Sequence, residues 1–163
     1  MLRPLLAGLV ILSLSAVAAH ADPCTAIPEK GPMPAALKRG ATFSGKVTYV
    51  GDGDSLCVAT GPRKTEWVEV RVADFYAPEM SSKEGAAAKA ALIRIAQGKV
   101  ATCRAGKRSW DRVVARCTIE GRSIAELMRR AGVAEGGRGQ PTAVSRSLSS
   151  TKSSGFGSSV ARQ

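Results

Sequence analysis

The sequence has little histidine and few aromatic residues. Its one histidine is His20, and aromatic residues make up 4% of the chain. His20 lies in an N-terminal segment that we predict is removed, and the remaining chain then has no histidine for a general base, a metal site or a Ser-His dyad. A Cys-x-x-Cys spacing is also lacking, so zinc and thiol redox sites are not expected. Several common classes of enzyme are thereby excluded.

The N-terminal segment is typical of a secretory signal peptide. It carries one charge, Arg3, followed by an apolar run from Leu5 to Ala19 and a small-x-small ending, Ala19-His20-Ala21. A membrane anchor is less favoured because the run is short for a span and ends in a cleavage pattern. We therefore expect cleavage after Ala21, a secreted or periplasmic location, and no membrane span in the mature chain.

The four cysteines would then meet an oxidising compartment, where two disulfides are the default. Three pairings are possible. We favour Cys103 with Cys117, because a hairpin centred on Trp110 would place them opposite each other, which leaves Cys24 to bind Cys57.

Basic residues outnumber acidic ones. The chain has 24 Lys and Arg against 13 Asp and Glu, a formal net charge of +11. Such an excess favours polyanionic partners, and nucleic acid is the obvious candidate. The alternative is a basic secreted protein whose charge serves solubility or adhesion to an anionic envelope.

The pattern of residues predicts a small α+β domain that is mainly β. We expect strands at Thr42–Val50, Ser55–Thr60, Trp67–Phe75, Val100–Arg104 and Val113–Ile119. Ser81 and Glu84 have the spacing of a capping box that opens a helix ending at Gly98, and a second capping box at Ser123 and Glu126 opens a short helix ending at Gly132. In the first helix Ala88, Ala91, Leu92, Ile95 and Ala96 should face inward, and in the second Ile124, Leu127, Met128 and Ala131.

Five short strands with the first helix between strands three and four close most economically as a Greek-key barrel of the oligonucleotide-binding (OB) type. The predicted organisation is a signal peptide at 1–21, an extended segment at 22–40, the barrel domain at 41–135, and a disordered Ser/Gly-rich basic tail at 136–163. We expect a monomer.

Several charged residues are candidates for phosphate chemistry. Asp52 and Asp54, one residue apart in a turn, suit a hard cation such as Ca²⁺, although Asp-Gly turns often have a structural role alone. Arg71 either forms an ion pair with Glu69 on the same strand face or joins Arg112 and Glu79 in a clamp that recognises phosphate oxygens.

Trp110 is a candidate for stacking on a base, and its alternative is packing over the rim of the barrel. These candidates predict a polyanion site, and the residue types alone do not establish that the side chains converge.

These motifs occur in an order that resembles the staphylococcal-nuclease (thermonuclease) family. The resemblance runs from Ala41 to Ala134 through Asp52-Gly53-Asp54-Ser55, Val70-Arg71-Val72, Ala77-Pro78-Glu79, Trp110-Asp111-Arg112-Val113-Val114-Ala115 and Leu127-Met128-Arg129-Arg130-Ala131-Gly132-Val133-Ala134. It implies an OB-type barrel and calcium-dependent hydrolysis of phosphodiesters in DNA and RNA.

By position, the resemblance implies that Asp54 is a calcium ligand, Asp52 an outer carboxylate and Ala77 a donor through its backbone carbonyl. Glu79 would be the general base, and Arg71 and Arg112 the phosphate-binding pair. The family's second calcium aspartate is Tyr76 here, and a phenol is a far poorer ligand than a carboxylate.

Asp74, which would share a strand face with Tyr76, is a possible substitute ligand. A second departure is Asp111, where the family usually has glycine.

The sequence thus supports two hypotheses. In the first, the protein is a secreted or periplasmic calcium-dependent endonuclease acting on single-stranded DNA or RNA. In the second, it is a catalytically inactive OB-fold protein that binds single strands. A third, an envelope-associated structural domain, is the least favoured.

Overall fold

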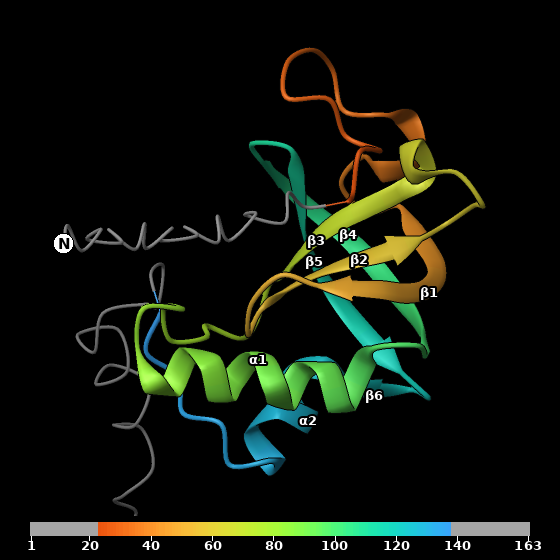
Figure 1. Ribbon diagram of the computed structural model, residues 1–163. Helices are drawn as coiled ribbons and strands as arrows, with labels where there is room; N and C mark the ends of the chain where they lie inside the picture. Colours follow the sequence, from red (N-terminus) through yellow and green to blue (C-terminus); the bar gives the residue numbers. More distant parts are fainter. Residues whose placement is uncertain (1–22, 138–163) are drawn as a thin grey trace, which may run out of the picture.

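A computed structural model describes residues 23–137 of the chain, which form one barrel with two helices (Figure 1). The predicted signal peptide and nearly all of the predicted tail lie outside these residues. The elements, in order, are η1 (Ala35–Leu37), β1 (Thr42–Val50), β2 (Ser55–Ala59), η2 (Lys64–Glu66), β3 (Trp67–Val72), α1 (Lys83–Ala96), β4 (Val100–Ser109), β5 (Arg112–Ile119), β6 (Arg122–Ser123) and α2 (Ile124–Arg130).

The five longer strands close on themselves. They are ordered β3-β2-β1-β4-β5, and a parallel pairing of β3 with β5, in which Val70 lies opposite Val113, joins the two edges. The other pairings are antiparallel, and β6 forms a short ladder with the C-terminal end of β5. This closed mixed barrel confirms the predicted OB-fold-like α+β class, with α1 between β3 and β4 as expected.

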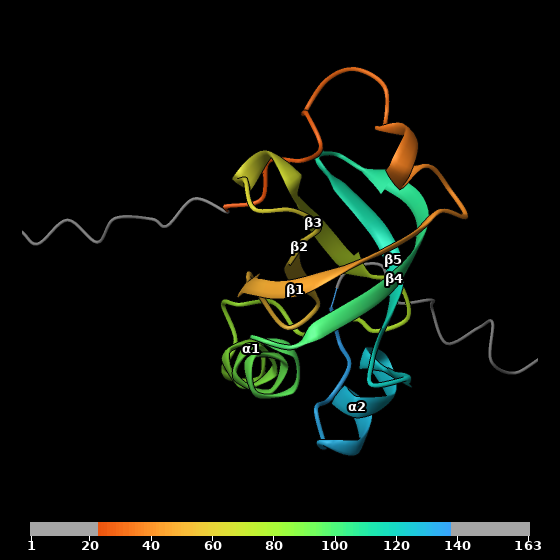
Figure 2. The ribbon, with the colours of Figure 1, turned by 90° about the vertical axis from the view of Figure 1, so that its right-hand side faces the viewer.

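Alternation along the strands fills the barrel. On β5, for example, Val113, Ala115, Cys117 and Ile119 are buried while the residues between them are not. Both helices lie at one end of the barrel (Figures 1 and 2), where they contact each other. In α1 the predicted residues are buried except Ile95, which is partly buried, whereas in α2 Ala125 is buried and Ala131 is exposed.

Both predicted disulfides are present, Cys24–Cys57 and Cys103–Cys117. Cys103 and Cys117 are direct cross-strand partners on β4 and β5, as the hairpin prediction requires. The N-terminal segment is not merely extended, because it forms η1 and buries Ile27 and Leu37. Its backbone also hydrogen-bonds to that of Trp67 through Ala26.

Several predicted boundaries are wrong for local reasons. Strand β3 ends at Val72 rather than Phe75, and β4 continues to Ser109, with an irregularity between Ala105 and Arg108 that keeps the basic residues in the ladder. The α1 N-cap is Ser82, whose hydroxyl accepts a hydrogen bond from the Gly85 N–H at 3.0 Å. Ser123 precedes α2 without a side-chain cap, so the second predicted capping box does not form.

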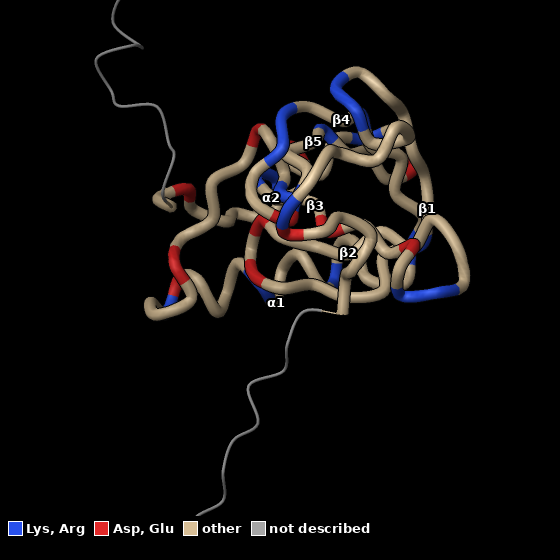
Figure 3. Tube along the Cα trace, turned by 90° about the horizontal axis from the view of Figure 1, so that it is seen from above, with Lys and Arg blue, Asp and Glu red and all other residues tan. Residues whose placement is uncertain are grey.

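Lys and Arg positions are prominent along β4 and β5 in Figure 3. Within residues 23–137, no helix combines the length and the apolar character needed to cross a bilayer.

Candidate functional site

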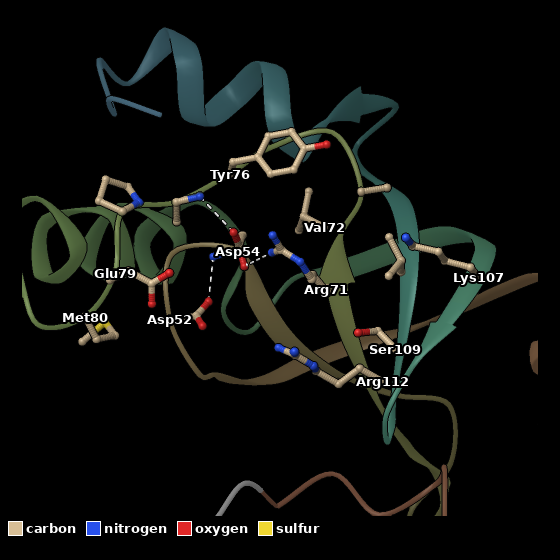
Figure 4. A pocket seen from close by; sticks show the side chains of 14 residues that line it. Asp52, Asp54, Arg71, Val72, Tyr76, Glu79, Met80, Lys107, Ser109 and Arg112 are labelled. Atoms are coloured by element: carbon tan, nitrogen blue, oxygen red, sulfur yellow. Dashed lines mark hydrogen bonds and ion pairs between the residues drawn. The ribbon is translucent and has the colours of Figure 1, made fainter. Parts of the chain in front are cut away.

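A polar pocket of about 580 Å³ lies where β3 and β5 meet in parallel (Figure 4). It collects residues from four parts of the barrel: the β1–β2 turn, the end of β3 with the segment that follows it, and β4 and β5. Its charged lining residues, among those the structure describes, are Asp52, Asp54, Arg71, Glu79, Lys107 and Arg112. Cations and carboxylates are therefore balanced in formal charge.

The β1–β2 turn is held by its own polar groups. The Gly51 N–H donates to the Ser55 carbonyl at 2.9 Å, and the Asp54 N–H donates to Asp52 Oδ1 at 2.9 Å. Asp52 thus has the structural role expected of an Asp-Gly turn while it also lines the pocket. Gly53 lets the turn pack closely, since a Cβ there would overlap the Cβ atoms of Ala77 and Ala88.

Asp54 is the most deeply placed carboxylate of the pocket, with 6% of the residue exposed. Its Oδ1 lies 2.5 Å from Arg71 Nη1, and its Oδ2 accepts a hydrogen bond from the Ala77 N–H at 2.9 Å. Burial raises the pKa of Asp54 above its ordinary value, against the opposing effects of the Arg71 and Ala77 hydrogen bonds. The carboxylate therefore anchors both β3 and the segment that follows it.

Arg71 is positioned from two sides. Asp54 binds one guanidinium nitrogen, and the guanidinium carbon lies 5.7 Å from the centroid of the Tyr76 ring. Glu69 instead accepts a hydrogen bond from the Ser55 hydroxyl at 3.2 Å and lies 3.9 Å from Arg112 Nε. Arg71 thus forms an ion pair with Asp54, a partner that the sequence analysis did not name.

Glu79 is presented by the turn that leads into α1. Its carbonyl accepts hydrogen bonds from the N–H and the hydroxyl of Ser82, at 2.9 and 3.0 Å. Gly85 allows the helix to approach this turn, because a Cβ at position 85 would overlap the Glu79 carbonyl oxygen. In Figure 4 the Glu79 carboxylate lies at the rim of the pocket on the side of Asp52.

The structure brings together Asp52, Asp54, Arg71, Ala77, Glu79 and Arg112 from the sequence prediction, and it adds Lys107 and Ser109. These two were missed because residues 106–112 were expected to form a loop. The basic composition of that segment could have indicated that it contributes to an anion-binding site.

Asp74 and Trp110 do not line the pocket. Asp74 follows the end of β3, so it has no strand alternation with Tyr76; its Oδ2 lies 4.0 Å from Arg116 Nε, and its carbonyl accepts a hydrogen bond from Arg129. Trp110 occupies the β4–β5 turn with φ 60° and 84% exposure, so it is not packed over the barrel rim. Because the ring is exposed, base stacking by Trp110 stays a prediction.

The residues do not fit a resident calcium ion as they lie. Within residues 23–137, no group of three or more His, Cys, Asp or Glu side chains is arranged to hold a metal. Both carboxylate oxygens of Asp54 accept from protein donors, and Tyr76 supplies no carboxylate. The Ala77 N–H points to Asp54, while the Ala77 carbonyl lies against Gly137, where a Cβ would overlap it.

The sequence matches no protein-family model and no curated protein. The class of protein is therefore argued from the barrel and its pocket: an OB-fold-like domain with paired cations and carboxylates at one end.

Proposed function

We propose that this protein is a secreted or periplasmic thermonuclease-like phosphodiesterase that acts on single-stranded DNA or RNA. The observation that carries the proposal is that Arg71 of β3, Glu79 of the segment before α1 and Arg112 of β5 line one pocket. The order of the motifs along the chain and the net charge of +11 support it.

The cations of the pocket suit the binding of a phosphodiester. Guanidinium groups donate two hydrogen bonds to phosphate oxygens in a fixed geometry, and the Lys107 ammonium adds a point charge. Arg71 is already held by Asp54 and the Tyr76 ring, so it loses little conformational freedom when it binds. Arg71 and Arg112 then stabilise the charge that develops on the phosphate oxygens.

Glu79 directs the attacking water. The water oxygen forms a new bond to phosphorus as one ester P–O bond breaks, the water proton passes to the Glu79 carboxylate, and the leaving oxygen takes a proton from solvent. Because the described residues do not fit calcium, no step uses a metal ion. The expected rate is therefore the same with calcium and with a chelator.

The alternative function is binding of single strands without hydrolysis. The specific observation that favours it is the engagement of both Asp54 oxygens by Arg71 and Ala77, next to Tyr76 at the family's second metal-ligand position. In this case Glu79 would have no catalytic task, and affinity would fall steeply with salt.

Cleavage of a fluorophore-quencher single-stranded oligonucleotide separates the two functions. The purified mature chain is compared with Glu79→Gln and with Glu84→Gln, which removes a carboxylate from the exposed side of α1. The enzyme proposal expects cleavage by the wild type and by Glu84→Gln, with a loss of at least about 100-fold in Glu79→Gln.

Each assay is run in calcium and in chelator. Binding of the oligonucleotide without cleavage above the Glu79→Gln level establishes the alternative, and no binding at all overturns both. Cleavage that requires calcium would contradict the metal-free step.

A further inference from the structure

A second hollow, of about 360 Å³, adjoins the candidate site on the outer face of β4 and β5. It is lined by Arg39, Gly40, Ala73, Arg104, Ala105, Gly106, Val114 and Arg116. Ala73 and Val114 line both this hollow and the candidate site, so the two are adjacent. We call it the three-arginine hollow.

Two of the three arginines belong to one hairpin, and the third comes from the segment before β1. Arg39 precedes β1, where the Gly40 N–H donates to the Ala105 carbonyl at 2.8 Å and ties this segment to β4. Arg104 and Arg116 are direct cross-strand partners on β4 and β5. Like charges placed opposite each other destabilise a sheet, so the Arg104–Arg116 pairing lowers the stability of the barrel when no ligand is bound.

Little negative charge offsets this cluster. None of the described residues that line the hollow is Asp or Glu. The Asp74 carboxylate lies beside the cluster, with its Oδ2 4.0 Å from Arg116 Nε. The Arg116 side chain is nevertheless 77% exposed. The hollow is therefore strongly cationic, whereas the adjoining pocket is formally balanced.

At Gly106 no side chain rises from the backbone that lines the hollow. Gly106 lies at the irregularity of β4, and a Cβ there would overlap the Val114 carbonyl oxygen. A ligand with an anionic group can therefore reach the arginines of both strands along this surface.

We propose that the three-arginine hollow binds a second backbone phosphate of the same single strand whose phosphodiester lies in the candidate site. The inference rests on the proposed interaction with single-stranded nucleic acid and extends it. A nucleic acid is favoured over an anionic membrane because the hollow adjoins the candidate phosphate site, and a polymer with repeated phosphates can occupy both at once.

The length of the ligand provides the test. Fluorescence anisotropy is measured for a dinucleotide with one phosphate and for a 12-mer, with the mature chain carrying Glu79→Gln to prevent cleavage. Adding Arg104→Gln and Arg116→Gln should weaken binding of the 12-mer about tenfold and lower the salt slope by about 0.7, the value for one phosphate on a single strand. Binding of the dinucleotide should be unchanged.

The matched control replaces Arg94 on α1 and Arg122 on β6 with glutamine, which removes the same charge from exposed positions elsewhere. The inference is overturned if the hollow variant and this control weaken the 12-mer equally while the parent still binds it. If the parent binds neither oligonucleotide, the proposed function fails with it.

Vesicles containing phosphatidylglycerol form the last arm. Loss of vesicle binding in the hollow variant, with 12-mer binding intact, would assign the hollow to a membrane and overturn the inference. Circular dichroism of each variant separates loss of a contact from loss of the fold.

Discussion

The candidate site and the three-arginine hollow share two lining residues, but their cations have different partners and different exposure. In the candidate site Arg71 is paired with a carboxylate that is 6% exposed, and its side chain is 20% exposed. In the hollow Arg104 faces Arg116 across the ladder, and Arg116 is 77% exposed with one distant carboxylate. A cation in the first region stabilises the folded chain, whereas a cation in the second costs stability and is available to a ligand.

This difference predicts which substitutions destabilise the fold and which weaken binding without destabilising it. Arg71 joins the β1–β2 turn to the end of β3 through Asp54, so replacing Arg71 should destabilise the barrel. Arg104 and Arg116 of the hollow project from strands that are already held by backbone pairing and by the Cys103–Cys117 disulfide.

The largest expected effect is that of Arg71→Ala on stability. It leaves the buried Asp54 carboxylate without its guanidinium partner, and we expect a loss of about 2 kcal/mol in the free energy of unfolding. Urea denaturation of the variant and of Arg104→Ala measures the contrast, and the second change should stay within about 0.5 kcal/mol. Adding Asp54→Asn to Arg71→Ala should recover part of the loss. Equal effects of the two arginine changes would remove the distinction between the regions.

The next effect concerns calcium. Tyr76→Asp adds a carboxylate beside Asp52 and Asp54 in the pocket, and we expect calcium then to raise the melting temperature of the variant but not that of the wild type. At a calcium concentration ten times the dissociation constant, the gain is about 1.4 kcal/mol.

Tyr76→Asn is the matched neutral control and should show no response to calcium. An equal calcium response in the wild type would mean that Tyr76 is not what prevents ion binding.

A sequence pattern predicts features that depend on near neighbours or on pairing in a hairpin. The inward positions Ala88, Ala91, Leu92 and Ala96 of α1 and the Cys103–Cys117 disulfide were of this kind, and both are confirmed. The Asp54–Arg71 contact depends on where the side chain of the turn before β2 meets that of β3, and the hollow also needs Arg39, which is far in sequence from the β4–β5 hairpin. Arg39, Arg104 and Arg116 each look like a solvated surface residue until β4 and β5 are paired.

The helix starts show the same limit at short range. Ser81 and Ser82 both offer a hydroxyl three residues before a candidate partner, and the spacing to Glu84 favoured the wrong one. The choice is made by Gly85, whose close approach to the Glu79 carbonyl fixes the turn before the helix.

The pH dependence of stability should also distinguish the regions. Because burial raises the folded-state pKa of Asp54, the folded chain binds this proton more tightly than the unfolded chain does. The contribution of Asp54 is therefore most favourable at low pH and is lost as the pH rises through the raised pKa.

Unfolding of the wild type and of Asp54→Asn, measured from pH 7 down to pH 4, should show the wild type gaining relative to the variant. A relative loss on acidification would contradict the sign of the pKa shift.

The smallest expected effect is a gain in stability from the hollow. Arg104→Thr removes one of two like charges that lie opposite each other, so it should raise the free energy of unfolding by about 0.5 kcal/mol at low ionic strength. The gain should disappear in 1 M salt, where screening acts over about 3 Å. Arg104→Lys keeps the charge and should show neither the gain nor its salt dependence. If Arg104→Lys stabilises as much as Arg104→Thr, the arginine pair is not repulsive, and the cost that we assign to an empty hollow is absent.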